Sequence, residues 1–328
     1  MPGAALPRAF KKFNLHVMGY KTAIEYEPRY IELHRKGILK ERVGILKQIL
    51  NDCTLCPRNC HVNRNAGKKG KCRVGSEIII SGVHPHFGEE ACLVGTHGSG
   101  TIFFASCNMN CIYCQNFEIS RFKQGEIVSV YTLADSMLYL QKIGCHNINL
   151  VTPTHYVPQI VEAIEIAVNK GLKIPIVYNC GGYESVDTLK LLDGIIDIYM
   201  PDIKYSDNAN GLKYSGVPDY WDVVRPAVKE MWRQVGDLEI VDGIAVRGLL
   251  IRHLVLPNNI AGSEKVFEFI ANEISRNTYV NIMAQYRPCF NAFLKPELAR
   301  RITIQEYREA VRTAQKFGLR RIELSPWY

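Results

Sequence analysis

Three cysteines, Cys107, Cys111 and Cys114, lie within eight positions of one another, directly after the apolar run TIFFAS at residues 101–106. Thiols at such a spacing can form a disulfide, a zinc site or an iron–sulfur cluster. A disulfide leaves one thiol over, and zinc takes four protein ligands, or three and a water in catalytic sites. Three thiolates on a [4Fe–4S] cluster leave one iron free for a further ligand. The spacing therefore favours a cluster at a reaction site.

A second group of cysteines lies in the stretch CTLCPRNCHVNRNAGKKGKC and consists of Cys53, Cys56, Cys60 and Cys72. Four thiols within twenty residues, with a glycine-rich turn before the last, predict a metal knuckle that holds either zinc or a second iron–sulfur cluster. The neighbouring basic side chains suit a surface tetrathiolate site with excess negative charge, which favours zinc slightly. The other cysteines stand singly and are expected to be small buried apolar residues: Cys92, Cys145, Cys180 and Cys289.

The composition indicates a globular protein of the cytoplasm. With 328 residues, of which 47% are hydrophobic, the chain can bury a large core. The N-terminal stretch lacks the apolar core of a signal peptide, and no run of about 18 apolar residues predicts a membrane span. In the reducing compartment that this implies, clustered cysteines bind metals more often than they form disulfides.

The charge is concentrated near the N-terminus. Residues 1–75 contain 16 Lys and Arg against 5 Asp and Glu. Such a surplus can dock an acidic protein or a nucleic acid, and the plainer interpretation is a solvated face. A nucleic acid is not an expected partner, because basic and aromatic residues do not interleave.

From residue 100 onward, short β-rich runs alternate with helical patterns. The runs predict strands at 101–106, 147–152, 175–180, 196–202, 249–257 and 279–286. Helices are predicted at 132–143, 158–171, 185–194, 220–232, 263–275 and 303–318, the last opened by a capping box of Thr303 and Glu306. This alternation predicts an α/β fold with a parallel sheet, either open or curved into a partial barrel.

Polar residues follow one predicted strand after another. In parallel α/β folds the carboxyl ends of the strands meet at one edge, where the chemistry occurs. We expect this edge to carry Cys107, the segment Thr152–His155, Asn179, Asp202 with Lys204, and His253 within its strand. Such a distribution favours an enzyme.

The motifs SGTIFFASCNMNCIYCQN, YNCGGYE, MPDIKY, IRHLVLP and NIMAQYRP, taken together and in this order, resemble those of a known family. The spacing Cys-x3-Cys-x2-Cys with Tyr113 before its third cysteine is similar to the signature of the radical S-adenosylmethionine (SAM) superfamily. The full set resembles the branch related to pyruvate formate-lyase activating enzyme, the PflX-type branch. The resemblance covers roughly residues 50–328. It implies a partial (β/α)6 TIM-like barrel.

The resemblance also implies a reaction. Cys107, Cys111 and Cys114 would ligate a [4Fe–4S] cluster, and the cluster would reductively cleave SAM to methionine and a 5′-deoxyadenosyl radical. The radical would take hydrogen from a substrate, here expected to be a protein or peptide. A low-potential electron donor of the flavodoxin or ferredoxin type is the implied partner. The residues implied to contact SAM are Tyr113, Thr152, Thr154, Asn179, Asp202, Lys204 and His253, with the two threonines standing where relatives carry Gly-Gly-Glu.

The expected organisation has three parts. Residues 1–52 form a basic, mostly helical extension, residues 53–95 form the four-cysteine knuckle and a connector, and residues 96–328 form the barrel. Three other functions compete with the leading one. They are a radical SAM enzyme that acts on a small molecule, a non-catalytic iron–sulfur electron carrier, and a zinc-knuckle nucleic-acid module.

Overall fold

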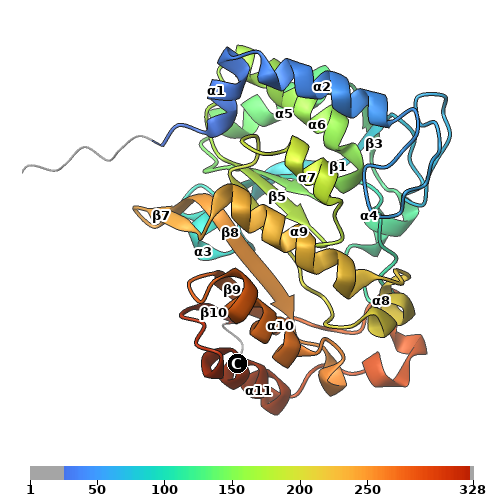
Figure 1. Ribbon diagram of the computed structural model, residues 1–328, viewed down its shortest axis with the longest axis vertical. Coiled ribbons are helices and arrows are strands. Elements are labelled where there is room, and N and C mark those ends of the chain that lie inside the picture. Colours follow the sequence, from blue (N-terminus) through green and yellow to red (C-terminus); the bar gives the residue numbers. More distant parts are fainter. Residues whose placement is uncertain (1–25, 326–328) are drawn as a thin grey trace, which may run out of the picture.

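The described part of the N-terminal extension, residues 26–52, is mostly helical and packs on the outside of the sheet domain (Figure 1). The computed structural model describes residues 26–325, so the first 25 residues of the expected 1–52 extension lie outside the described part. Helices α1 (Arg29–Arg35) and α2 (Ile38–Ile49) lie against α6 (Val157–Asn169). Tyr30 is fully buried, and its hydroxyl donates to the Ile174 carbonyl at 2.8 Å. The described end of the extension is therefore anchored to the rest of the chain.

A single sheet organises the domain. Its strand order is β10-β9-β8-β6-β5-β4-β2-β1-β3, with β7 paired to β8. The strands β2, β4, β5, β6, β8, β9 and β10 run parallel, and all six predicted strands are confirmed with shifted ends. The bounds are β1 (Ile78–His86), β2 (Ser99–Phe104), β3 (Glu126–Val128), β4 (Ile148–Val151), β5 (Ile176–Cys180), β6 (Ile198–Pro201), β7 (Glu239–Val241), β8 (Ile244–Leu254), β9 (Tyr279–Met283) and β10 (Arg321–Leu324).

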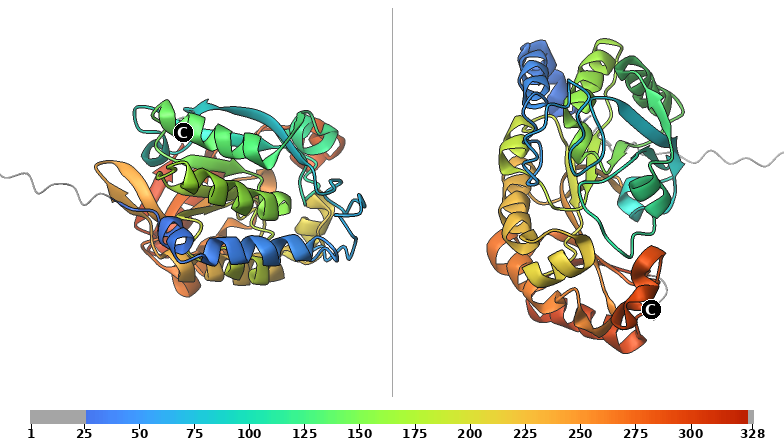
Figure 2. Two further views of the ribbon diagram at one scale, coloured as in Figure 1. Left: turned by 90° about the horizontal axis from the view of Figure 1, so that it is seen from above. Right: turned by 90° about the vertical axis from the view of Figure 1, so that its right-hand side faces the viewer.

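The helices cover the outer face of the curved sheet (Figure 2, left). The six predicted helices are confirmed, although the one expected at 263–275 ends as a π-turn over Ile270–Ile274. The capping box is also confirmed, because the Thr303 hydroxyl accepts from the Glu306 amide. Besides α1, α2 and α6, the helices are α3 (Ala91–Val94), α4 (Phe117–Phe122), α5 (Val130–Lys142), α7 (Val186–Leu191), α8 (Asn208–Ser215), α9 (Tyr220–Val235), α10 (Ser263–Phe269) and α11 (Ile304–Lys316).

Beyond the six predicted strands, β1 and β3 extend one end of the sheet, β10 extends the other, and β7 pairs with β8. The segment expected as a connector contains β1, which pairs antiparallel with β2, and β10 adds a seventh parallel strand beside β9. Both lack a continuous apolar run, since β1 carries two histidines and a proline and β10 alternates charged and apolar residues. Within residues 26–325, no pairing joins the outermost strands β3 and β10. The sheet is therefore a partial barrel that stays open.

The carboxyl ends of the parallel strands face the right-hand side of Figure 1, and the right panel of Figure 2 looks onto them. We call this end the mouth. It gathers the loop after β2, the irregular segment 51–77, α8 and the turn after β9.

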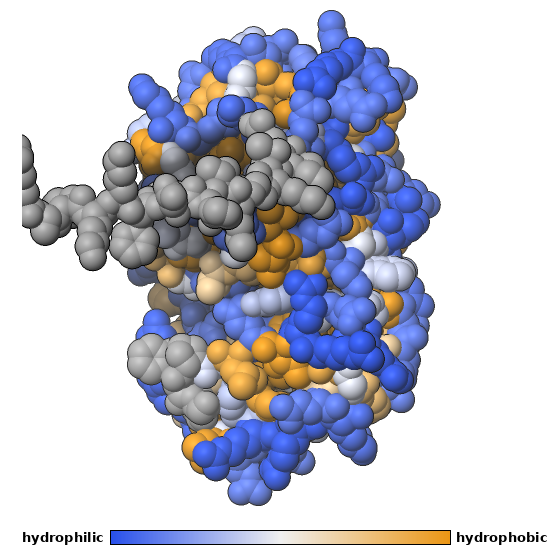
Figure 3. All heavy atoms as spheres, turned by 90° about the vertical axis from the view of Figure 1, so that its left-hand side faces the viewer, coloured by the Kyte–Doolittle hydropathy of each residue, from blue (hydrophilic) through white to orange (hydrophobic). Residues whose placement is uncertain are grey.

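On the opposite face, apolar side chains lie between hydrophilic ones (Figure 3). Each helix in residues 26–325 is too short or too polar to cross a membrane.

Candidate active site

The loop after β2 carries the three closely spaced cysteines, and neighbouring elements fix its path. The amides of Asn110 and Ile112 donate to carbonyls at the end of α8, both at 2.9 Å. The Asn108 side chain donates to the Tyr183 carbonyl after β5, at 2.8 Å. Ser106 adopts a left-handed backbone, with φ +74°, where the chain turns out of the sheet. The loop is therefore held by several elements rather than by its own turn alone.

Each thiol of this loop has a polar neighbour. The Met109 amide donates to Cys107 Sγ at 3.4 Å, and the Ser215 hydroxyl donates to Cys111 Sγ at 3.0 Å. Cys114 Sγ lies 3.2 Å from the Ser120 hydroxyl. Donors of this kind stabilise the thiolate form that ligates a metal. All three side chains are half-buried.

The three thiols also lie close enough to act on one another. Burial raises the pKa of Cys107 to about 12, and the neighbouring Cys111 and Cys114 add to the rise. Residues 26–325 contain no three Cys, His, Asp or Glu side chains that converge on a point as the ligands of one metal ion do. The ligands of a [4Fe–4S] cluster bind separate irons and need not converge in this way. Three neighbouring thiols with adjacent donors thus fit a cluster.

Asp202 and Lys204 form an ion pair at the end of β6. Lys204 Nζ lies 2.6 Å from Asp202 Oδ2, and the side chains are 18% and 26% exposed. Burial lowers the pKa of Lys204, but the attraction of Asp202 and of the nearby Cys111 outweighs it and holds the pKa well above its usual value. The Tyr220 hydroxyl accepts from the Lys204 amide at 2.8 Å and orients this segment. The predicted Asp-x-Lys motif therefore lies beside the cysteine loop.

The ends of β4 and β5 meet at the same edge. The Thr152 amide donates to the Asn179 carbonyl at 2.9 Å, and both residues are half-buried. Thr152 has a left-handed backbone, with φ +60°. Thr154 is buried, and its hydroxyl donates to Glu184 Oε1 at 2.6 Å. Thr154 is thus occupied by a carboxylate of the same chain.

Glu184 is a buried residue that the sequence interpretation did not single out. Besides the Thr154 contact, it accepts from the Tyr178 hydroxyl at 3.0 Å. Burial raises its pKa to about 7, against the smaller lowering effect of these hydrogen bonds. The motif YNCGGYE contained the signal, since a glutamate there follows a strand after two glycines. Glu184 therefore places a carboxyl group next to Thr154 at this edge of the sheet.

The two histidines near the strand ends are packed and neutral. His253 Nδ1 lies 2.8 Å from the Ile203 carbonyl and its Nε2 lies 2.9 Å from the Ser263 hydroxyl, so protein groups meet both nitrogens. Burial lowers its pKa to about 4. His155 Nε2 lies 2.9 Å from the Ala105 carbonyl, and burial lowers its pKa to about 3. In this arrangement His253 supports the backbone between Asp202 and Lys204.

Tyr113 lies in an aromatic group at the mouth. Its ring is 5% exposed and meets Tyr286 and Tyr205 edge to face, with centroid distances of 5.9 and 6.4 Å. These rings form an apolar wall directly beside the cysteine loop. The arrangement is suited to packing against a flat ring and excluding water.

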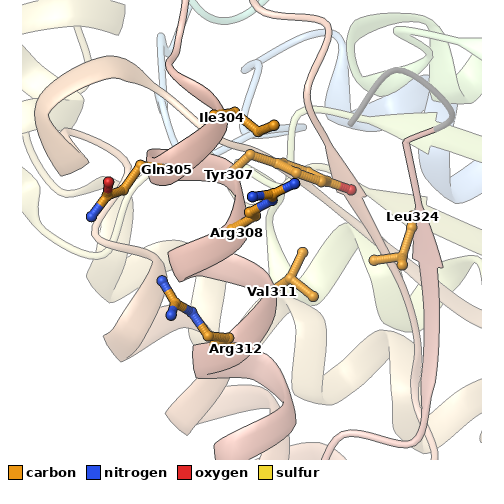
Figure 4. Close-up of a pocket in the computed structure, with 7 residues that line it drawn as sticks. All are labelled: Ile304, Gln305, Tyr307, Arg308, Val311, Arg312 and Leu324. Carbon is orange, nitrogen blue, oxygen red and sulfur yellow. The ribbon is translucent and has the colours of Figure 1, made fainter.

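A shallow hollow of about 550 Å³ lies elsewhere, between α11 and β10 (Figure 4). None of the predicted site residues lines it, so we do not assign the chemistry to it. Its walls are formed by Ile304, Gln305, Tyr307, Arg308, Val311, Arg312 and Leu324.

Comparison with known proteins identifies the family. The Radical SAM superfamily matches residues 101–246. The chain is 33% identical over 298 residues to the uncharacterized protein MJ0674 of Methanocaldococcus jannaschii. The aligned region covers 88% of this chain and 82% of that protein.

Solved structures match part of this chain at low identity. The [FeFe]-hydrogenase maturase HydG is 12% identical, with a TM-score of 0.47 over 67% of this chain and 48% of that one. SuiB of Streptococcus suis, bound to its precursor peptide SuiA, is 13% identical, with a TM-score of 0.47 over 67% of this chain and 46% of that one. This chain therefore spans about half the length of these two proteins.

The chain belongs to the radical SAM superfamily and is a radical SAM enzyme. As in the rest of the superfamily, its cofactors are a [4Fe–4S] cluster and SAM. The membership excludes the non-catalytic electron carrier as the function of the whole chain.

Proposed function

We propose that this radical SAM enzyme abstracts hydrogen from a protein or peptide, in the manner of the activating-enzyme branch that its motifs resemble. The observation that carries the proposal is an exposed apolar surface at the mouth, next to the three-cysteine loop. We call it the aromatic rim. It consists of the exposed Phe122, Phe293 and Leu294, together with Phe117 and Phe290, which are half-buried and pack against Phe122.

The aromatic rim joins the two sides of the mouth. Phe117 begins α4, shortly after Cys114, and its ring stacks on Phe290 after β9 at a centroid distance of 5.2 Å. Phe122, Phe293 and Leu294 are 62%, 64% and 74% exposed. Large apolar side chains that remain exposed together usually mark a surface that another macromolecule covers.

Basic groups border the same surface. The Arg121 guanidinium lies over the Phe290 ring at 5.7 Å, and Lys123 Nζ donates to the Arg73 carbonyl at 3.1 Å. Arg73 follows Cys72 in the irregular segment 51–77, whose Lys68 and Lys69 are exposed. An acidic polypeptide with apolar side chains would complement this combination of charge and apolar area.

Much of the remaining N-terminal basic charge serves contacts within the chain. Arg29 pairs with Asp193 at 3.0 Å, and Lys47 pairs with Glu162 at 2.6 Å. These side chains lie on the outside of the barrel, where α1 and α2 pack on α6. Among residues 26–75, the basic charge nearest the mouth is therefore the part best placed to steer a partner.

The residues of the mouth suit the proposed chemistry. Cys107, Cys111 and Cys114 would hold the cluster, which with SAM supplies one-electron chemistry and hydrogen abstraction when bound. Lys204, oriented by Asp202, presents a positive charge to a carboxylate at this edge. The tyrosine wall excludes water, which would otherwise compete for a reactive centre.

The test separates macromolecules from small molecules. Reduced enzyme and SAM are incubated with two fractions of an extract from the source cells, the dialysed protein and the small-molecule filtrate. We expect the protein fraction to raise the release of 5′-deoxyadenosine above that of enzyme alone, together with a glycyl radical signal or a mass change on a peptide. Stimulation by the filtrate alone would instead indicate a small-molecule substrate.

A matched pair of variants tests the aromatic rim itself. Replacing Phe122, Phe293 and Leu294 by Ser should remove the stimulation by protein, while the slow cleavage of SAM without substrate continues. Replacing the exposed Tyr131 and Tyr139 of α5 by Ser removes apolar area away from the rim, and stimulation should persist. Equal loss in both variants would contradict a specific role for the rim.

A further inference from the structure

The irregular segment 51–77 contains neither helix nor strand and supplies two arginines, Arg58 and Arg73, to the three-cysteine loop. The segment is fixed in place, because the buried Arg64 donates to the carbonyls of Gly75 and His155 at 2.9 and 2.8 Å. Its four cysteines are free thiols, and the metal predicted for them stays a prediction: Cys53, Cys56, Cys60 and Cys72. Through the two arginines the segment contacts the candidate active site.

Arg58 bonds the loop on one side. Its Nε donates to the Asn108 carbonyl at 2.9 Å, and its Nη1 donates to the Gly216 carbonyl at the end of α8 at 2.7 Å. Asn108 directly follows Cys107 in the chain, and the same end of α8 accepts from two amides of the loop. Arg58 therefore joins the loop to the helix that supports it.

Arg73 bonds the loop on another side. Its Nη2 donates to the Ser120 carbonyl and, at 3.4 Å, to the Ser106 hydroxyl. Ser106 directly precedes Cys107, and the Ser120 hydroxyl lies 3.2 Å from Cys114 Sγ. One guanidinium thus contacts residues that adjoin or touch two of the three thiols.

Arg121 of α4 completes the set. Its Nη2 donates to the Asn110 carbonyl at 3.1 Å, and its Nη1 donates to Asn110 Oδ1. Asn110 directly precedes Cys111. Each cysteine of the loop therefore has a guanidinium bonded to a residue that adjoins it in sequence or touches its sulfur. We call Arg58, Arg73 and Arg121 the arginine clamp.

The arginine clamp has no carboxylate partners within residues 26–325, where the ion pairs of arginine all involve other arginines. The three side chains are half-buried, and burial lowers the pKa of Arg73, to which the neighbouring Arg121 adds. Arg58 Nη2 and Arg73 Nε are buried and have no acceptor among the described residues. Cations and donors in such a place are costly unless negative charge and acceptors lie nearby, and thiolates with inorganic sulfides would supply both.

We propose that Arg58, Arg73 and Arg121 are positioning residues for the radical reaction, which hold the three-cysteine loop in its ligating shape and offset the negative charge of the cluster that it would carry. One-electron reduction makes such a cluster more negative, so nearby cations favour its reduced form and raise its potential. The irregular segment thereby contributes to the chemistry through its arginines. The inference rests on the three cysteines as cluster ligands and does not depend on the proposed substrate.

The experiment uses the full chain, reconstituted anaerobically with iron and sulfide. SAM identifies the cluster of interest, because a cluster with an open iron can take SAM as a ligand and change its electron paramagnetic resonance. In a redox titration of that signal, Arg73→Met should shift the equilibrium about tenfold toward the oxidised form, which lowers the midpoint potential by about 59 mV. Arg58→Met and Arg73→Met should also lose iron to a chelator about 10- to 100-fold faster than the wild type.

Two further variants separate the effects. Arg73→Lys keeps the positive charge but loses the planar fork of donors, so its midpoint potential should return close to that of the wild type while iron loss stays faster. Arg42→Met is the matched control, since the half-buried Arg42 of α2 donates to the Leu191 carbonyl at 3.2 Å and makes no contact with the loop. This control should match the wild type in both measurements.

An unchanged midpoint potential in Arg73→Met would overturn the proposal, because the guanidinium would then be only a structural anchor. Equal changes in Arg42→Met would overturn it as well, since they would reflect general destabilisation. The variant Cys107→Ala tests the ligand assignment separately. It should lose the SAM-dependent signal with the clamp intact, and retention of that signal would refute the ligands and the inference together.

Discussion

Glu184 makes the stability of this protein depend on pH in a direction that can be tested. The carboxyl group is 2% exposed and accepts hydrogen bonds from Thr154 and Tyr178, but no cation pairs with it among the ion pairs of residues 26–325. Burial disfavours its ionised form and raises the pKa from 4.5 to about 7. The variant Glu184→Gln keeps the size and polarity of the neutral acid and removes the titration.

The sign and size of the effect follow from linkage. The folded chain retains a proton that the unfolded chain releases above pH 4.5, so the stabilising contribution is present below that pH and is lost as the pH rises through 7. The difference in pKa corresponds to about 3 kcal/mol. Between pH 5 and pH 8 the free energy of unfolding of the wild type should therefore fall relative to that of Glu184→Gln by about 2–3 kcal/mol.

The measurement is urea unfolding, followed by circular dichroism at the two pH values under anaerobic conditions. Burial also raises the pKa of Asp197 to about 7. Its effect on the free energy of unfolding is the same in the wild type and in Glu184→Gln, so it cancels in the comparison. Glu268→Gln on α10 alters an exposed carboxyl group and serves as the control, which should follow the wild type. If Glu184→Gln shows the same pH dependence as the wild type, the carboxyl group is not kept neutral by burial and the reasoning fails.

Three further predictions concern single residues. Cys107→Ala should abolish the release of 5′-deoxyadenosine in a chromatographic assay, because the cluster would lose a ligand, and full release would refute the ligand assignment. Lys204→Met should destabilise the fold by about 1–3 kcal/mol and weaken SAM binding in equilibrium dialysis, because Asp202 loses its partner in a mostly buried pair; unchanged binding would place Lys204 outside the SAM site. Thr303→Ala should cost about 1 kcal/mol in urea unfolding through loss of the cap on α11, and no change would mean that Glu306 alone caps the helix.

The parallel core could be predicted because its strands are buried on both faces. Runs such as INLV in β4 and IYMP in β6 are apolar almost throughout, which distinguishes them from the amphipathic helices between them. The strands β1 and β10, near or at the ends of the sheet, gave no such signal. Both are only partly buried, so charged and polar residues are tolerated in them, and their pairing depends on neighbours distant in sequence.

The position of the polar residues at the mouth could also be predicted, because parallel strands must bring their carboxyl ends to one edge. Asp202 and Lys204 lie there beside Cys111, as the motif order indicated. The sequence did not predict which of these polar side chains are free to contact a ligand and which are hydrogen-bonded within the protein. His253 meets protein groups with both ring nitrogens and Thr154 donates to Glu184, and these contacts depend on distances that spacing in sequence does not contain.

The arrangement of the mouth explains why its buried polar groups are so numerous. The loop of Cys107, Cys111 and Cys114 must bring thiols together, and burial raises the pKa of Cys107 and Cys111. Lys204 acts against that rise at Cys111, and amide and hydroxyl donors act on the individual sulfurs. Two of these groups are oriented by further contacts. Asp202 Oδ2 lies 2.6 Å from Lys204 Nζ, and the Tyr205 hydroxyl lies 2.8 Å from the Ser215 hydroxyl. The polar network at the strand ends therefore counteracts the burial of these thiols, and a substitution within it should lower both cluster retention and the stability of the fold.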